Sequence, residues 1–264
     1  MKPLFRKFVS IAVIAGVALP FLVLTMWSFS NRWFYPDLWP GQWGFRAWNY
    51  VFGTAGIQII SALIQSLLVA MVTAIISVII GMPAGRALGL YGFRGKDLIS
   101  VILTLPIIVP PLCVSMGLHL WFIKIGLAET FLGVVLVHLT FCLPYSVFVM
   151  WGVFSSYNPD YEEQARSLGA SVWQTFFRIM LPLTFPGVIV AGLFSFLLSW
   201  SQYLSTLIIG GGRVTTLPIL LFALMGSGDR PVAAAVGIIF VIPAFLVLLF
   251  SSRYLGARSI AAIR

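Results

Sequence analysis

Few residues of this chain are of the types that catalyse reactions. The 264 residues include two histidines and seven acidic residues, and none of the acidic ones falls in the core of an apolar run. No Ser–His–acid set, His-Glu-x-x-His metal pattern or Gly-x-x-x-x-Gly-Lys-Ser/Thr phosphate loop occurs in the sequence. His119 and His138 stand alone in apolar runs, where packing or hydrogen bonding is the more frequent role. We therefore predict a non-catalytic chain that itself binds no metal and no cofactor.

Other polar or aromatic side chains inside the apolar runs are candidates for contact with a solute. In transporters, unwound or proline-broken helices line the cavity that binds the substrate near the bilayer midplane. Hydrogen bonds between helices are the alternative role for each of these polar residues. The predicted lining residues of a solute pathway are Ser115, His119, Ser195, Ser199, Trp200, Gln202 and Tyr203.

The most polar stretch of the chain, residues 155–185, is predicted to form two short helices. Acidic residues crowd the start of the first helix, which suits its positive end, and Gly169 offers a left-handed end. Ser171 and Gln174 have the spacing of a capping box for the second helix, and Pro182 is expected to end it. Two capped helices held between two spans can transmit a push, and a surface hairpin without a partner is the alternative.

The elements that must position these residues are membrane-spanning helices. Of all residues, 60% are hydrophobic and 9% charged, against roughly 45–50% and 25% in soluble domains. One span requires about 20 apolar residues. We predict an all-α polytopic membrane protein that forms a single domain over residues 1–264, with 155–185 as a loop between the fourth and fifth spans. The predicted transmembrane helices are 9–29, 59–81, 98–122, 131–154, 187–209 and 232–250.

The basic residues predict the orientation of the spans. Eleven of the 16 Lys and Arg residues flank the spans on one side and five on the other, and the richer side is cytoplasmic by the positive-inside rule. Both termini and the 155–185 loop then lie in the cytoplasm. The basic residues are scattered singly rather than gathered on one face, so membrane lipid and not nucleic acid is the expected partner.

The first outside loop is rich in tryptophan, with Trp27, Trp33, Trp39, Trp43 and Trp48. Indole rings prefer the headgroup layer of a bilayer, so we interpret this loop as an interfacial anchor. A surface that stacks on sugars or docks a partner is the alternative.

The cytoplasmic loop resembles the EAA loop of permease subunits in bacterial binding-protein-dependent ABC importers. The family pattern is Glu-Ala-Ala, three residues, Gly, nine residues and Ile-x-Leu-Pro. Gln164 replaces the second residue of this pattern. The resemblance covers nearly the whole chain and is to type I importers with a MetI-like transmembrane domain, and residues 138–145 look closest to the spermidine/putrescine branch. The anchors that match are Glu163, Ala165, Gly169, Ile179, Leu181 and Pro182.

The resemblance implies a permease in the bacterial cytoplasmic (inner) membrane and a set of partner chains. These are a second permease, similar or identical, two cytoplasmic ATP-binding subunits that carry ATP and Mg, and an external or periplasmic substrate-binding protein. ATP binding would draw the ATPase subunits together, and the loop would carry that movement into the spans. The ATPase-coupling residues that the resemblance implies are Glu162, Glu163, Gln164, Ala165, Arg166, Gly169, Ala170, Ile179, Leu181 and Pro182.

A polyamine is the solute that the resemblance favours. A pathway for such a cation is expected to contain an acidic residue, and no span core of this chain has one, so the second permease would have to supply it. Sugars, phosphonates and other solutes are alternatives within the same family. A secondary transporter or a channel is the alternative from a different class of membrane protein.

Overall fold

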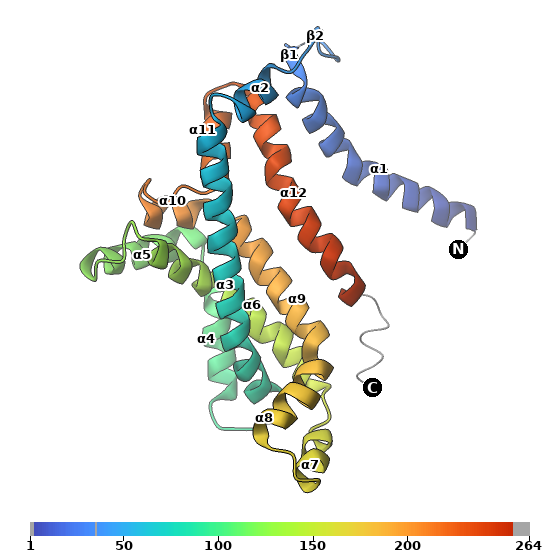
Figure 1. The fold of residues 1–264 in the computed structure, drawn as a ribbon, viewed down its shortest axis with the longest axis vertical. Helices are drawn as coiled ribbons and strands as arrows, with labels where there is room; N and C mark the ends of the chain where they lie inside the picture. The colour runs from blue at the N-terminus through green and yellow to red at the C-terminus, as the bar shows by residue number, and fades with distance from the viewer. Residues whose placement is uncertain (1–2, 35, 256–264) are drawn as a thin grey trace. The chain divides into compact units, whose positions relative to one another are not determined.

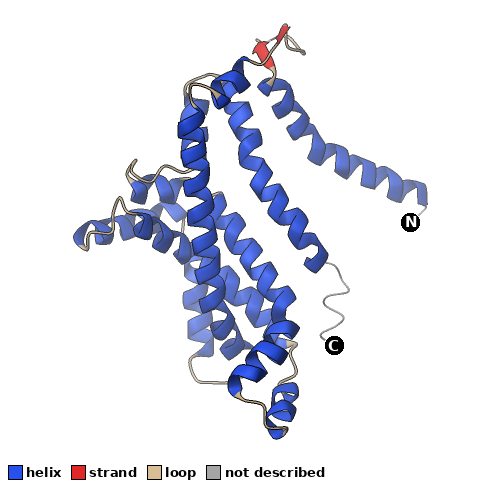
Figure 2. Cartoon of the chain, in the orientation of Figure 1, coloured by secondary structure: helices blue, strands red, loops and turns tan. Residues whose placement is uncertain are grey.

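The computed structural model describes residues 3–34 and 36–255. Lys2, Arg258 and Arg264, which contribute to the predicted orientation, lie outside the described residues. Almost all of the described chain is helical, and its strands are the short antiparallel pair β1 (Ser30–Arg32) and β2 (Gln42–Trp43), as Figure 2 shows. The all-α prediction is therefore confirmed apart from this small hairpin.

Among the described residues, five helices are long and apolar enough to cross a membrane, and the bent pair α4–α5 makes a sixth candidate. The predicted spans 9–29, 131–154 and 232–250 overlap α1, α6 and α12. In chain order, and as labelled in Figure 1, the helices are α1 (Pro3–Ser28), α2 (Arg46–Phe52), α3 (Gly56–Leu90), α4 (Lys96–Ile108), α5 (Pro111–Lys124), α6 (Phe131–Ser155), α7 (Asp160–Ser167), α8 (Val172–Thr175), the π-helical η1 (Phe176–Met180), α9 (Leu181–Trp200), α10 (Leu204–Gly210), α11 (Leu217–Gly226) and α12 (Arg230–Leu255).

The helices group into two compact units. The first comprises Met1–Ile64 and Leu217–Pro243, and the second comprises Gln65–Thr216 and Ala244–Arg264. The first unit thus holds α1, the hairpin, α2, α11 and the beginning of α12, and the second unit holds α4 to α10. Helices α3 and α12 run through both units, and the single domain over 1–264 stays a prediction.

Helix α3 is longer than the predicted span 59–81, because it continues to Leu90. Residues 82–90 include Pro83, Arg86 and several small residues, so hydropathy alone does not extend the span. The glycines at this end allow α3 to approach α6 closely, and helices in lipid associate through such contacts. A Cβ built at Gly85 would lie 2.5 Å from the Cβ of Met150 on α6. The same contact repeats every four residues along α3, where Gly81 faces Ser146 and Gly89 faces Phe154.

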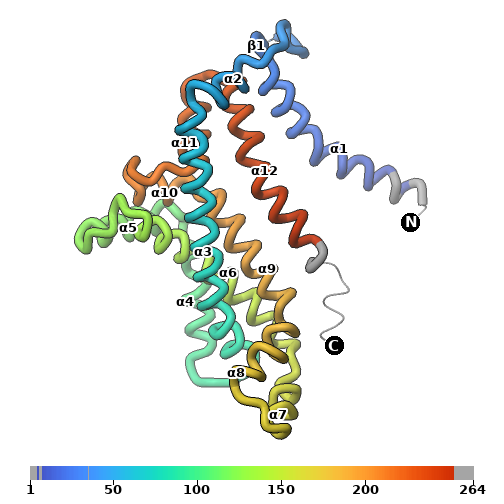
Figure 3. The backbone as a smooth tube through the Cα atoms, in the orientation of Figure 1, coloured from blue at the N-terminus to red at the C-terminus, as the bar shows by residue number. Residues whose placement is uncertain are grey.

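The predicted span 98–122 is broken into two helices. The axes of α4 and α5 differ by 101°, and the sharp turn of the chain between them is visible in Figure 3. Pro110 and Pro111 cause the break, because proline lacks an N–H and disfavours helical backbone in the residue before it. Val109 is accordingly extended, with ψ 134°, and Pro111 occupies the first turn of α5, where no N–H is needed.

The predicted fifth span, 187–209, is also wrong in its bounds. One uninterrupted helix runs from Val172 to Trp200 through α8, η1 and α9, and a break precedes α10. Pro182 does not end the second loop helix as expected, because it lies in the first turn of α9, where a missing N–H is tolerated. The wider π-helical turn comes directly before it, and there the Leu181 N–H bonds to the carbonyl of Phe176. The second helix of the loop is therefore the beginning of the long helix that ends at Trp200.

We predict that Gly85→Leu lowers the stability of the second unit by about 1–3 kcal/mol, the usual cost of overpacking. The added side chain would meet the backbone of α6, which cannot move aside without separating the helices. The measurement is the thermal unfolding of the purified membrane complex. Gly117→Leu is the matched control, since nothing lies within 4 Å of a Cβ at Gly117. Equal unfolding temperatures for the two variants would contradict the prediction.

Candidate functional site

Helix α7 and the start of α8 have well-defined ends. The side chain of Asn158 accepts a hydrogen bond from the Asp160 N–H at 2.9 Å, and Gly169, with φ +86°, lies just beyond the end of α7. Ser171 Oγ accepts from the Gln174 N–H at 3.3 Å, and Gln174 Oε1 accepts from the Ser171 N–H at 2.8 Å. The two hydrogen bonds form the capping box that the sequence predicts. These caps fix both helix ends and limit how far the connection between them can bend.

Glu162 is the buried acidic residue of α7. Its side chain is 7% exposed, and its Oε2 lies 2.8 Å from Arg86 Nη2 of α3 and 3.8 Å from Arg166 Nη2. The hydroxyl of Tyr157 lies beside this carboxylate, and burial together with the charge of Glu162 raises the pKa of Tyr157. A buried carboxylate requires such partners, because an unpaired charge away from water is strongly unfavourable. The ion pair therefore ties α7 to the C-terminal end of α3.

The two adjacent glutamates of α7 have different environments. The side chain of Glu162 is buried within the protein, whereas Glu163 and Gln164 are exposed. Glu162 therefore positions α7, although the resemblance groups it with residues that contact a partner. Glu163 remains available to such a partner.

Both halves of the predicted coupling motif line one hollow of about 450 Å³. Apolar side chains of this part of the chain are exposed, namely Leu168 at 89%, Trp173 at 72% and Val172 at 69%. Contiguous exposed apolar surface is typical of sites of protein contact. The hollow is lined by Tyr161, Gln164, Ala165, Leu168, Arg178, Ile179, Pro182 and Leu183. Other predicted coupling residues lie outside this lining, namely Glu162, Glu163, Arg166, Gly169, Ala170 and Leu181.

A buried histidine bridges the break between α9 and α10. His138 of α6 places Nδ1 at 2.8 Å from Ser199 Oγ and Nε2 at 2.9 Å from Thr206 Oγ1. The Thr206 hydroxyl donates its proton to the Gln202 carbonyl at 2.8 Å, so it can only accept from the histidine. Nε2 therefore carries a proton, and Nδ1 bonds to the Ser199 hydroxyl. His138 is thus a fully hydrogen-bonded group that holds three helices around the break.

A second chain of hydrogen bonds reaches the same break from α5. Ser115 Oγ donates to Ser205 Oγ at 3.2 Å, and Ser205 Oγ donates to Gln202 Oε1 at 3.0 Å. Both serines are fully buried. Together the two sets of hydrogen bonds form a polar cluster that contains no acidic, lysine or arginine side chain.

The predicted lining residues divide into three groups. Ser115, Ser199 and Gln202 belong to the polar cluster, so helix–helix hydrogen bonds account for them. Trp200 is buried and stacks on Phe196, with 5.8 Å between ring centroids. The remaining residues are Ser195, His119 and Tyr203.

Two atoms of that last group are orphaned. Ser195 Oγ and His119 Nδ1 are buried and have no hydrogen-bond partner within the described part of the chain. Such groups normally bond to something, and water or a solute can complete them. Tyr203 is half-buried in the break itself, between the ends of α9 and α10.

Four residues of these clusters escape prediction from the sequence, namely Arg86, Tyr157, Ser205 and Thr206. Arg86 and Glu162 are 76 residues apart, so no local spacing pairs them. The glycine repeat at 81, 85 and 89 is the one signal that predicts close packing at this end of α3.

A family model for the binding-protein-dependent transport system inner membrane component matches residues 77–260 of this chain. The match includes α7, the hollow and the polar cluster. The spermidine/putrescine transport system permease protein PotC of Haemophilus influenzae is 27% identical over 242 residues, which are 90% of this chain and 91% of that protein. The putrescine transport system permease protein PotI of Escherichia coli is 29% identical over 247 residues, which are 91% and 86% of the two chains.

Solved structures share the fold. A chain of a bacterial ABC transporter involved in the import of the acidic polysaccharide alginate has a TM-score of 0.72 and 18% identity, and the alignment covers 97% of this chain and 99% of that one. A chain of the alginate transporter in complex with its alginate pentasaccharide-bound periplasmic protein has a TM-score of 0.63 and 17% identity, with 95% and 94% covered.

We predict that Glu162→Gln destabilises α7 by about 1.5–3 kcal/mol, the typical worth of a hydrogen bond to a charged group. The substitution leaves Arg86 without its carboxylate. Hydrogen exchange of residues 160–167 in the purified complex measures the effect. Glu163→Gln is the matched control and should change the exchange free energy by less than about 0.5 kcal/mol, because its side chain is exposed. Similar protection in both variants would refute the prediction.

Proposed function

Because this chain belongs to the family of binding-protein-dependent transport system inner membrane components, we propose that it forms half of the pathway by which an ATP-driven importer admits a polyamine. Members of this family are multi-pass permease subunits of ABC importers in the bacterial inner membrane, and they catalyse no reaction. They bind no cofactor themselves. Membership decides against the secondary transporter and the channel, the alternatives from another class.

The proposed partners are those that the family implies. They are a second permease, two ATP-binding subunits that carry ATP and Mg, and an external binding protein. The alginate transporter, which has the same fold, was crystallised with its periplasmic protein, and this supports the last partner. We place six spans in the membrane, with α4–α5 as a broken one, and both termini in the cytoplasm. The hollow on α7 then faces the ATP-binding subunits.

The observation that carries the coupling proposal is the uninterrupted helix from Val172 to Trp200. Its cytoplasmic end exposes Trp173, and its other end stops at the break beside the polar cluster. At 1.5 Å per residue the helix is about 43 Å long, so a displacement at one end reaches the other without a flexible joint. Swinging a two-state gate from 1:99 to 99:1 takes about 5.5 kcal/mol, which a loose loop would dissipate.

The ion pair between Glu162 and Arg86 couples α7 to the displacement of the membrane helices. The hollow is shared by α7 and the η1–α9 turn, and Glu162 fixes α7 to Arg86 of α3. An ATP-binding subunit that engages the hollow therefore displaces α3 and α9 together. We assign Glu163 and Gly169 to coupling rather than folding, since the Glu163 side chain is exposed and nothing lies within 4 Å of a Cβ at Gly169.

We predict that Gly169→Leu reduces uptake by roughly tenfold or more in an assembled complex. The added side chain fills open space in which a partner is proposed to sit. Gly228→Leu is the matched control, because Gly228 also has positive φ (+81°) and open surroundings. Both variants carry a similar backbone strain of about 1–2 kcal/mol, so a difference between them isolates the contact.

The measurement is uptake and ATP hydrolysis by the complex in proteoliposomes with its loaded binding protein. Normal uptake by a normally assembled Gly169→Leu complex would remove the coupling proposal. Equal loss of uptake in both variants would assign the effect to backbone strain instead.

Relatives and aromatic side chains support a polyamine as the solute. PotC and PotI, which this chain resembles along most of its length, are spermidine/putrescine and putrescine permeases. Tyr203 in the break offers an aromatic face, which attracts ammonium groups. A sugar is the second candidate, because the polar cluster contains no acidic side chain and an alginate transporter shares the fold.

Two measurements separate the candidates. Calorimetry on the cognate binding protein should give saturable heat with spermidine or putrescine and none with oligosaccharides. In proteoliposomes, Tyr203→Ala should raise the KM for polyamine uptake by about fivefold, the worth of one cation–π contact, whereas Tyr203→Phe keeps the ring and the KM. Saturable heat with an oligosaccharide, and none with either polyamine, would contradict the polyamine proposal and favour a sugar as the solute.

A further inference from the structure

An apolar groove of about 520 Å³ lies among α1, α11 and α12 in the first unit. Its walls are hydrocarbon along most of their length. One basic residue, Arg230, stands at one end, and its guanidinium carbon lies 5.5 Å from the centre of the Trp27 ring. Leu24, Leu221, Met225, Phe240 and Val241 contribute to the apolar part.

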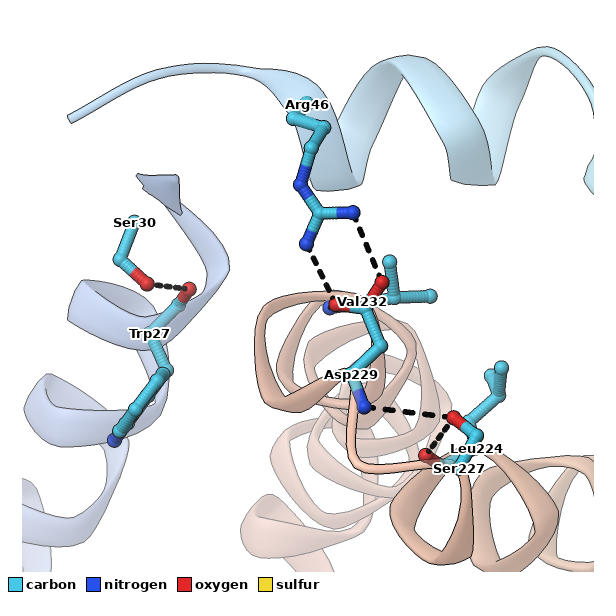
Figure 4. Close-up of polar contacts among 7 residues, drawn as sticks. All are labelled: Trp27, Ser30, Arg46, Leu224, Ser227, Asp229 and Val232. Atoms are coloured by element: carbon cyan, nitrogen blue, oxygen red, sulfur yellow. Dashed lines mark hydrogen bonds and ion pairs between the residues drawn. The ribbon is translucent and has the colours of Figure 1, made fainter. Parts of the chain in front are cut away.

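The charge of Arg230 is not neutralised by its neighbour Asp229. Both oxygens of the Asp229 carboxylate are held by Arg46, at 2.9 and 2.7 Å, as Figure 4 shows. This double hydrogen bond lowers the pKa of Asp229 and keeps its charge engaged. In the described ranges, 3–34 and 36–255, no carboxylate forms an ion pair with Arg230. The end of the groove is therefore positive.

The depth of the groove corresponds to one leaflet of a bilayer. Arg230 is the first residue of α12 and Trp27 is next to last in α1, so both stand where candidate spans leave the membrane. From Arg230 to Val241 a helix rises about 16 Å, which is half of the roughly 30 Å hydrocarbon core. The groove thus reaches from headgroup level to the midplane.

We propose that this groove binds an anionic phospholipid of the leaflet in which α12 begins. Arg230 holds the phosphate, with Trp27 beside it, and one acyl chain lies along the hydrocarbon walls. Gly237 lines the groove without a side chain of its own, opposite Leu24. Free phosphate would make no contact with the apolar walls of the groove. An apolar helix of another protein would leave the charge of Arg230 at the end of the groove without a partner.

The test is native mass spectrometry of the assembled complex, delipidated and then titrated with phosphatidylglycerol. We expect Arg230→Gln to weaken lipid retention by about fivefold, the worth of one basic residue at an anionic headgroup. Arg32→Gln, which removes an exposed charge outside the groove, is the control and should retain lipid like the wild type. Gly237→Leu should also weaken retention, because it fills the groove without changing its charge.

A photoreactive benzoylphenylalanine in place of Phe240 identifies the occupant in native membranes, where a lipid adduct is expected. A cross-link to another polypeptide would assign the groove to a protein and overturn the proposal. Equal retention by Arg230→Gln and Arg32→Gln would overturn it as well, as would equal binding of phosphatidylcholine or displacement of the lipid by inorganic phosphate.

Discussion

The close approach of α3 to α6 determines where α7 lies. Apolar burial does not draw helices together in lipid, so contact depends on shape, and Gly81, Gly85 and Gly89 provide it by leaving side chains out. Arg86 follows Gly85 directly, and the approach of the helices delivers it to Glu162. A packing constraint between α3 and α6 thereby positions a charge beside α7. The orientation of α7 follows from this constraint.

Features that depend on residues close together in the sequence can be predicted from it, whereas features that depend on tertiary contacts cannot. The capping box and the left-handed Gly169 were predicted because each involves a few adjacent residues. The prolines show the limit of such reasoning. Pro83 and Pro182 lie within helices, whereas Pro110 and Pro111 break one. Whether a proline breaks a helix depends on its position relative to the helix ends. Those ends are set in part by contacts with neighbouring segments.

The features of the candidate site also differ in how far the sequence predicts them. The resemblance brings together motif halves that the structure places around one hollow, although local spacing says nothing of that contact. The hydrogen-bond partners of polar residues in the apolar runs are harder to predict from the sequence. A serine in such a run has the same sequence pattern whether it bonds to another helix or to a solute. Ser115 and Ser199 bond helices, and Ser195 keeps an unpaired oxygen. His138 was interpreted as a hydrogen-bonding group, but its partners, Ser199 and Thr206, are 61 and 68 residues away.

The π-helical segment between α8 and α9 sets the rotation of one end of this helix about its axis relative to the other. A regular helix turns about 100° per residue, and η1 accommodates its residues in a wider turn. The direction in which Trp173 faces relative to α9 thus depends on the backbone geometry of η1 as well as on the number of residues between them. Replacing η1 by regular α-helical turns of the same length would turn that indole about the helix axis.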